Sequence, residues 1–257
     1  MLIVLSPAKS LDFESPVPAV DASEPEFAAD ARKLVRQLRE LAPAEIATLM
    51  AVSDPLAALN AARYSSFGTR ATRAAQRPAV LAFDGDVYTG LDARGLDASA
   101  LLFAQRHVRI LSGLYGLLRP LDLIRPHRLE MGTRLANERG RDLYDWWGAR
   151  PARALRRDMR RLGHDVLVNL ASQEYFRAVD CAALDVPVIQ PVFQERRAGG
   201  WKVISFDAKR ARGRMTRFAI DRRLTDPEAL KGFDADGYRF DRSASSASTW
   251  YFRRSAR

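Results

Sequence analysis

The sequence predicts a single domain of the mixed α/β (α+β) class over residues 1–257, in which a central mixed sheet is flanked by helices. Three observations predict it. Short, buried, β-branched runs alternate irregularly with segments of helical periodicity, as in a mixed sheet surrounded by helices. No stretch is rich enough in glycine, serine and proline to link two domains, and no internal repeat is present. A chain of this length buries about 70–75% of the surface that its unfolded form exposes, so it needs no disulfide bonds or bound metal in order to fold.

The first quarter of the chain predicts one strand and three helices. Residues 2–5 read as a short buried strand that Pro7 ends. Apolar side chains at helical spacing predict an amphipathic helix over 25–41. Two short helices follow, one over 43–50 and one from the capping residue Ser53 to about residue 67. The last two helices are joined by a tight turn and predict a helical hairpin.

The middle of the chain predicts a buried strand, two helices and a loop. The strand covers residues 79–83, and the first helix covers 97–109. Two prolines and two glycines predict a long ordered loop over 119–141. A longer helix is predicted over 142–162, and Gly163 ends it.

The last third predicts β-structure around one basic helix. Residues 166–170 read as a third short buried strand. A β-hairpin is predicted over 186–206, because two strand-like runs flank an Ala-Gly-Gly turn. The basic helix follows over 207–224. The aromatic segments 238–240 and 250–252 are then expected to pair around a serine-rich turn.

The charge of the chain points to a polyanionic partner. The 41 lysines and arginines exceed the 31 aspartates and glutamates, for a net charge of +10. Residues 1–128 carry 15 basic and 14 acidic side chains, whereas residues 129–257 carry 26 and 17. Such a field favours nucleic acid first and an anionic membrane second. The alternative is compositional bias, since 36 of the 41 cations are arginine, but bias does not explain why the excess lies in one half.

The sequence excludes several kinds of site. The single Cys181 rules out a disulfide framework and cysteine-based zinc sites, and the three histidines are far apart in the sequence. Neither a P-loop nor a GxGxxG loop occurs, so we expect no metal and no cofactor. The N-terminal apolar run is too short for a signal peptide or a membrane span, and we expect a soluble, cytoplasmic protein.

Two helices of the second half are candidates for a polyanion-binding surface. Within 208–218, apolar residues share one arc of the helix and cations occupy the remainder. Gly213 in this helix permits the close approach of a phosphate. Residues 150–161 repeat the pattern, with six arginines and one aspartate. The alternative for both helices is a solvated face that acids elsewhere neutralise. The cations of the first helix are Lys209, Arg210, Arg212, Arg214 and Arg217.

Polar side chains follow the ends of the predicted strands, where loops commonly carry active sites. If they converge, carboxylates beside a lysine can support acid–base chemistry or hold a phosphate. The alternative is that they cap turns and that Glu130 forms a structural salt bridge. Arg119 and Arg128 lie in the same long loop as Glu130. The candidates at the strand ends are Lys9, Asp86, Glu130, Asn169 and Glu174.

The predicted helical hairpin within 43–66 occupies the place of a helix–hairpin–helix element. Such an element binds DNA phosphates through main-chain N–H groups at a helix N-terminus. Its hairpin glycines are missing from residues 49–53, so plain core packing is the alternative.

Seven short segments occur in order along the chain: LSPAK at 5–9, GDVYTGL at 85–91, LSGLYG at 111–116, LRPLD at 118–122, RLEMG at 128–132, NLAS at 169–172 and AKRARG at 208–213. Each alone is a weak signal. Together, from residue 2 to about residue 240, they resemble the YaaA family of peroxide-stress resistance proteins.

The resemblance implies a single cytoplasmic domain of a family-specific fold, sometimes called the cantaloupe fold. It also implies DNA binding through a positively charged cleft and a helix–hairpin–helix element, and protection during hydrogen peroxide stress. Lys9, Lys209, Arg210 and Arg212 then become candidates for the cleft, and residues 43–66 for the helix–hairpin–helix. Residues 243–257 follow no pattern of the family that we recognise.

Two functions remain open. The first is a DNA-binding protein of the oxidative stress response that binds duplex or branched DNA without sequence preference and does not bind membranes. The second is an enzyme that acts on a nucleotide or nucleic acid in a pocket around the strand-end candidates, although the sequence assigns no reaction. The candidate DNA-binding residues are Lys9, Arg119, Arg128, Lys209, Arg210, Arg212, Arg214 and Arg217.

Overall fold

The fold is built on one mixed sheet, in a computed structural model that describes residues 1–69 and 75–255. The strand order is β11-β12-β9-β8-β1-β5-β6, and β10 pairs with β9. Strands β5, β1, β8, β9 and β12 run parallel, while β6, β10 and β11 are antiparallel to their neighbours. This confirms the predicted α/β class. The strands are β1 (Leu2–Leu5), β5 (Val108–Ser112), β6 (Gly116–Leu118), β8 (Leu167–Asn169), β9 (Val188–Arg197), β10 (Gly200–Lys202), β11 (Arg239–Asp241) and β12 (Thr249–Arg254).

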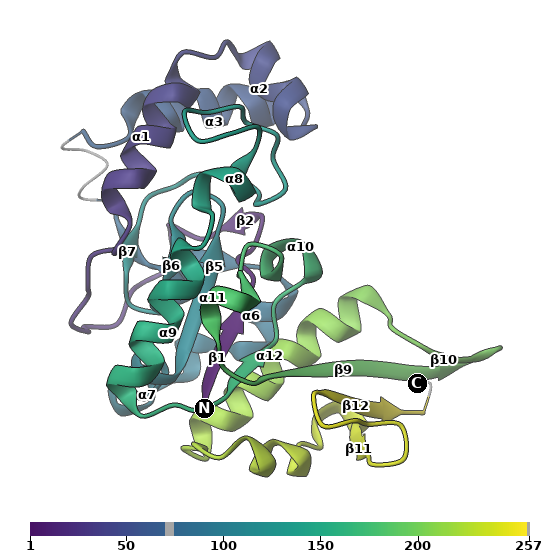
Figure 1. Cartoon of the computed structure of the whole chain (residues 1–257). Helices are drawn as coiled ribbons and strands as arrows, with labels where there is room; N and C mark the ends of the chain where they lie inside the picture. The colour runs from purple at the N-terminus through teal and green to yellow at the C-terminus, as the bar shows by residue number, and fades with distance from the viewer. Residues whose placement is uncertain (70–74, 256–257) are drawn as a thin grey trace.

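Helices surround the sheet. Figure 1 shows α1, α2 and α3 together at one end of the molecule, while β9, β10, β11 and β12 extend from the other as an arm. The helices are α1 (Ala28–Arg39), α2 (Pro43–Met50), α3 (Asp54–Ser66), α5 (Ala79–Ala82), α6 (Asp86–Leu91), α7 (Ala98–His107), α8 (Leu143–Trp147), α9 (Arg150–Leu162), α10 (Gln173–Phe176), α11 (Cys181–Leu184) and α12 (Ser205–Asp221). The predicted helical hairpin is confirmed as α2 and α3.

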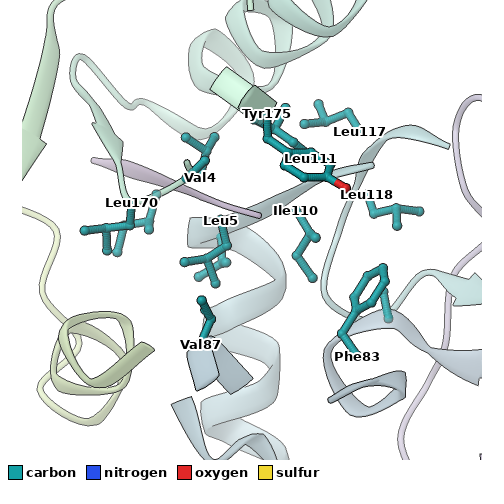
Figure 2. Packing of buried hydrophobic residues seen from close by; sticks show 14 of the residues in the cluster. Val4, Leu5, Phe83, Val87, Ile110, Leu111, Leu117, Leu118, Leu170 and Tyr175 are labelled. Atoms are coloured by element: carbon teal, nitrogen blue, oxygen red, sulfur yellow. The ribbon is translucent and has the colours of Figure 1, made fainter. Parts of the chain in front are cut away.

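The two faces of the sheet are covered by different helices because side chains alternate along each strand. In Figure 2, Val4 points to the side on which Tyr175 of α10 lies, whereas Leu5 points to the opposite side, toward Val87 of α6. Both β1 side chains are fully buried. The core is therefore a sheet between two layers, with α10 on one face and α6 on the other.

Several elements differ from the prediction, and three of the differences concern segments near the candidate residues or the arm. The expected strand over 79–83 is wrong: residues 79–82 form helix α5, and only Phe83–Asp84 form the short strand β4. The segment is buried as expected, and an apolar run this short does not distinguish a strand from a helix. The expected helix over 142–162 is two helices, because Gly148 adopts a left-handed φ of 49° and ends α8.

The third difference concerns the hairpin. Its second strand, β10, ends at Lys202, and α12 begins at Ser205 rather than at residue 207. At the C-terminus, the predicted pairing of aromatic segments is confirmed, with Phe240 of β11 opposite Phe252 of β12. Among the described residues, no helix has both the length and the apolar character that crossing a bilayer requires.

The buried His127 makes the fold sensitive to acid. Its Nδ1 lies 2.7 Å from the carbonyl oxygen of Arg125, and its ring packs against Tyr115 and Phe83. Burial lowers the pKa of His127 from 6.5 to about 4. The unfolded chain therefore binds a proton at this residue that the folded chain does not bind between about pH 6.5 and pH 4.

We expect the free energy of unfolding to fall as the pH falls through this window, with about 2 kcal/mol of the loss between pH 7 and pH 4.5 due to His127. Urea unfolding at both pH values measures the loss. In His127→Gln, which keeps an N–H donor for Arg125 but does not titrate, the loss should shrink by that amount. An equal loss in both proteins would contradict the assignment.

Candidate functional site

Helix α12, which carries five of the candidate cations, is held against α6 by two glycines. A Cβ on Gly213 would lie 1.8 Å from the carbonyl oxygen of Val87, and one on Gly90 would lie 2.2 Å from that of Arg210. The two backbones therefore touch, and only glycine fits at either position. The expectation that Gly213 admits a phosphate is wrong, because α6 already fills that space.

Two of the five candidate cations are matched by carboxylates. Arg214 Nε lies 2.8 Å from Asp236 Oδ2. Arg217 contacts Asp221 at 2.8 Å and Asp92 at 3.2 Å, and it donates a further hydrogen bond to the carbonyl oxygen of Asp92. Arg217 therefore ties the C-terminal half of α12 to the end of α6.

The other three cations, on the N-terminal half of α12, have no such partners. In the described part of the chain, Lys209, Arg210 and Arg212 form no ion pair with a carboxylate. Lys209 Nζ lies 5.7 Å from the ring centroid of Phe206, which is itself 72% exposed. Lys209 and Arg210 are exposed to solvent. This end of α12 therefore presents cations whose charge nothing nearby offsets.

Arg212 differs from its neighbours because it is largely buried. Its Nε is inaccessible to solvent and has no hydrogen-bond partner. Burial lowers the pKa of Arg212, and no carboxylate acts in the opposite direction. A buried polar group without a partner needs an explanation. Arg125 Nε and Arg128 Nε are likewise buried without a hydrogen-bond partner.

A second group of charges lies at the carboxyl end of the parallel strands. Lys9 Nζ lies 3.0 Å from Glu130 Oε2, and Arg128 lies 2.9 Å from the other oxygen of the same carboxylate. Glu174 Oε1 accepts a hydrogen bond of 3.0 Å from the main-chain N–H of Gly132. Burial, together with Glu174 and Glu130, raises the pKa of Tyr175. The structure thus brings together Lys9, Arg128, Glu130 and Glu174.

The two remaining strand-end candidates have separate surroundings. Asn169 ends β8, where its side chain donates to Gln190 at 3.0 Å and accepts from the N–H of Ala171 at 2.9 Å. Asp86 opens α6, and the backbone of the preceding Gly85 packs against Ala8. No contact joins either residue to Glu130 among the described interactions.

Arg119 lies elsewhere. It pairs with Asp122 at 2.9 Å and lines a cavity of about 420 Å³ that Arg109, Arg157 and Asp158 also line. The eight candidate DNA-binding residues are thus distributed over α12, the strand-end cluster and this cavity. Their role in DNA binding stays a prediction.

On α9, acids neutralise many of the arginines. Arg157 pairs with Glu26 at 2.6 Å, Arg150 pairs with Asp30 at 2.7 Å, and Arg156 pairs with Asp185. Arg153 and Arg160 are exposed and form no ion pair in the described part of the chain. This helix fits the alternative of a solvated, neutralised face better than that of a binding surface.

The helical hairpin of α2 and α3 has a negative charge where a phosphate would bind. Asp54 lies in the first turn of α3, and Glu45 lies in the first turn of α2. Both carboxylates compete with an anion for main-chain N–H groups at the helix N-termini. A phosphate-binding role for residues 43–66 stays a prediction.

Sequence reasoning missed a hydrogen-bonded group that links three of the quoted segments. Ser6 Oγ accepts from the N–H of Ser172 at 2.8 Å, and Tyr88 donates its hydroxyl proton to the carbonyl oxygen of Ser6 at 3.0 Å. These residues belong to segments 5–9, 85–91 and 169–172. The sequence shows the three segments together in one chain, but only the folded structure shows that their side chains meet.

A model of the family described as "Peroxide stress protein YaaA" matches residues 1–244. A UPF0246 protein of Burkholderia mallei (strain SAVP1) is 55% identical over 258 residues, covering 100% of this chain and 99% of its own. A UPF0246 protein of Janthinobacterium sp. (strain Marseille) is 53% identical over 254 residues, covering 99% and 98%. These similarities extend over the whole site described above.

The contact between α6 and α12 gives a stability prediction. Gly213→Ala forces a methyl group into the backbone of Val87, so we expect the free energy of unfolding to fall by about 2 kcal/mol or more, despite alanine's better helix propensity. Gly232→Ala is the matched control, because nothing lies within 4 Å of its added Cβ, and it should change stability by no more than about 0.5 kcal/mol. Equal urea midpoints for the two variants would contradict the close contact.

Proposed function

Because the chain belongs to the peroxide stress protein YaaA family, we propose that it is a DNA-binding protein of the hydrogen peroxide stress response that holds duplex DNA by its phosphates. The observation that carries this proposal is the unmatched charge on the N-terminal half of α12. Lys209, Arg210 and the largely buried Arg212 lack carboxylate partners in the described part of the chain, in contrast to Arg214 and Arg217 on the same helix.

Contacts of this kind are expected to be independent of sequence. Lysine and arginine side chains that reach phosphates fix the position of a duplex but do not read its bases. Each neutralised phosphate releases counterions, so the logarithm of the affinity falls with the logarithm of salt concentration by about 0.9 per contact. The net charge of +10 adds attraction at long range.

The strand-end cluster favours a second candidate function, an enzyme that acts on a nucleotide or nucleic acid. Lys9 and Arg128 share the carboxylate of Glu130, and Glu174 lies beside them on the Gly132 N–H. A lysine and an arginine near a carboxylate can hold a phosphate and move a proton. In the structure, however, both cations form ion pairs with Glu130. A purely structural salt bridge explains this arrangement as well.

The DNA-binding proposal predicts a charge-specific loss of affinity. Lys209→Glu with Arg210→Glu should weaken binding to several unrelated duplexes alike and make the salt slope shallower by about 1.8. Arg153→Glu with Arg160→Glu on α9 is the matched control, because it changes the net charge by the same amount at exposed, unpaired positions. Fluorescence anisotropy between about 50 and 200 mM salt measures both effects.

The result that contradicts this proposal is an equal loss in the two double variants, since net charge alone then explains binding. Undetectable binding of the unmodified protein near about 50 mM salt also contradicts it.

The enzyme candidate predicts that a substitution in the strand-end cluster affects product release and not duplex affinity. If the strand-end cluster is catalytic, the protein releases phosphate or base from nucleoside triphosphates or oligonucleotides, and Glu130→Gln abolishes this release while leaving duplex affinity unchanged. Chromatographic product detection and anisotropy measure the two properties on the same samples. Absence of products with the unmodified protein, or full turnover in Glu130→Gln, excludes catalysis by this group.

A further inference from the structure

The arm of the sheet has one open face. Along β9, Phe193 and Glu195 are buried on one side, whereas Val192 and Gln194 on the other side are partly exposed. The same alternation holds in β12, where Phe252 is buried. Near β1, the corresponding face is covered by α10, as the position of Tyr175 shows in Figure 2. In Figure 1, β9 and β10 continue beyond the helices.

The open face carries aromatic rings and guanidinium groups in contact. Trp201 of β10 has the guanidinium carbon of Arg196 at 5.5 Å and that of Arg253 at 4.8 Å from its ring centroid. Arg253 also lies 5.4 Å from the ring of Tyr251. Because one guanidinium touches both rings, their centroids lie at most about 10 Å apart. Trp201 and Tyr251 are both partly exposed.

The charge of the arm is strongly positive. Residues 188–202 and 239–254 together contain seven lysines and arginines and two acids. One acid, Glu195, is buried and pairs with Arg254 at 2.7 Å. The other, Asp241, pairs with Arg253 at 2.8 Å. Arg196 is exposed and forms no ion pair in the described part of the chain. Lys202 is exposed as well, but it lies opposite Glu195 and therefore points to the other face.

We propose that this face binds an unpaired stretch of a DNA strand, with bases stacked on Trp201 and Tyr251 and a phosphate on Arg196, which is paired with Trp201 and so shares its face. Aromatic rings on a flat sheet, interleaved with arginines, are the chemistry by which proteins bind single strands without sequence preference. The choice of DNA rests on the proposed function. The duplex site on α12 and the arm then bind different parts of one substrate, a duplex that contains or borders an unpaired segment.

A base-paired duplex does not satisfy this face, because its bases are stacked on one another and offer no free ring. A membrane does not fit either. The two rings are only partly exposed, and arginines contact both of them, so they do not form an apolar face for insertion. An unpaired strand supplies both the negative charge and the free bases that the face lacks.

The tryptophans of the chain make the site directly observable. Trp146, Trp147 and Trp250 are buried, so Trp201 is the tryptophan that a base can reach. Adding an oligothymidine of about 15 nucleotides should quench the intrinsic fluorescence, with a salt slope of about 0.7 per neutralised phosphate. Trp201→Phe should keep the affinity, measured by anisotropy of labelled oligothymidine, but lose the quenching.

The affinity test uses the same labelled strand and a duplex of equal length. Trp201→Ala and Tyr251→Ala should each weaken oligothymidine binding about 5- to 150-fold and leave duplex affinity within about twofold. Thr249→Ala is the matched control, because it removes a side chain from the same face without removing a ring. Near-ultraviolet circular dichroism and thermal unfolding confirm that the variants remain folded.

The outcomes separate the two proposals. Duplex binding without oligothymidine binding overturns the arm site and leaves the duplex site standing, whereas binding of neither overturns both. Equal losses for the strand and the duplex in Trp201→Ala also overturn the arm site. Tighter binding of oligouridine than of oligothymidine overturns the assignment of the occupant as DNA.

Discussion

Burying a guanidinium without a carboxylate beside it is unfavourable, since water no longer solvates the charge and nothing replaces it. Arg212 is in this position, and burial lowers its pKa without any opposing charge. The glycine contact between α6 and α12 fixes the helix that carries it, because Gly213 and Gly90 leave no freedom to shift. The fold therefore holds one largely buried cation that has no carboxylate partner, and two exposed cations, Lys209 and Arg210, lie next to it on α12.

Several other arginines, in contrast to Arg212, have carboxylate partners. Arg109 is buried with Asp158 at 2.8 Å, Arg254 with Glu195, and Arg157 is shared between Glu26 and Asp158. Many of the arginines therefore have structural ion-pair partners. Exposed cations without an ion pair in the described part of the chain include Arg153 and Arg160 on α9, Lys209 and Arg210 on α12, and Arg196 on the arm. Residues 203–204 connect β10 of the arm to α12. The two proposed binding surfaces, on α12 and on the arm, therefore belong to consecutive elements of the chain.

Much of the fold could be predicted from the sequence, because β1, β8 and α12 carry strong local patterns of apolar residues. The prediction of a strand at 79–83 was wrong because a short apolar run is compatible with either a strand or a helix. The backbone partners of this segment, at Pro120 and Asp122, are far away in the sequence. The candidate site was harder to predict. Lys209, Arg214 and Arg217 look alike in the sequence, and only Asp92 and Asp236, from distant segments, distinguish them. The open face of the arm depends on the parallel pairing of β9 and β12, which no local pattern indicates.

The most direct test of the unmatched charge is the NMR signal of the Arg212 Nε–H group, assigned by its absence in Arg212→Lys. On addition of a short duplex in low salt, the account predicts that this signal shifts, because a phosphate that binds the other nitrogens of the Arg212 guanidinium changes the charge around the buried Nε. The Nε–H signals of Arg109 and Arg254, which already have carboxylate partners, should not move. An unchanged Arg212 signal at saturating duplex would contradict the account.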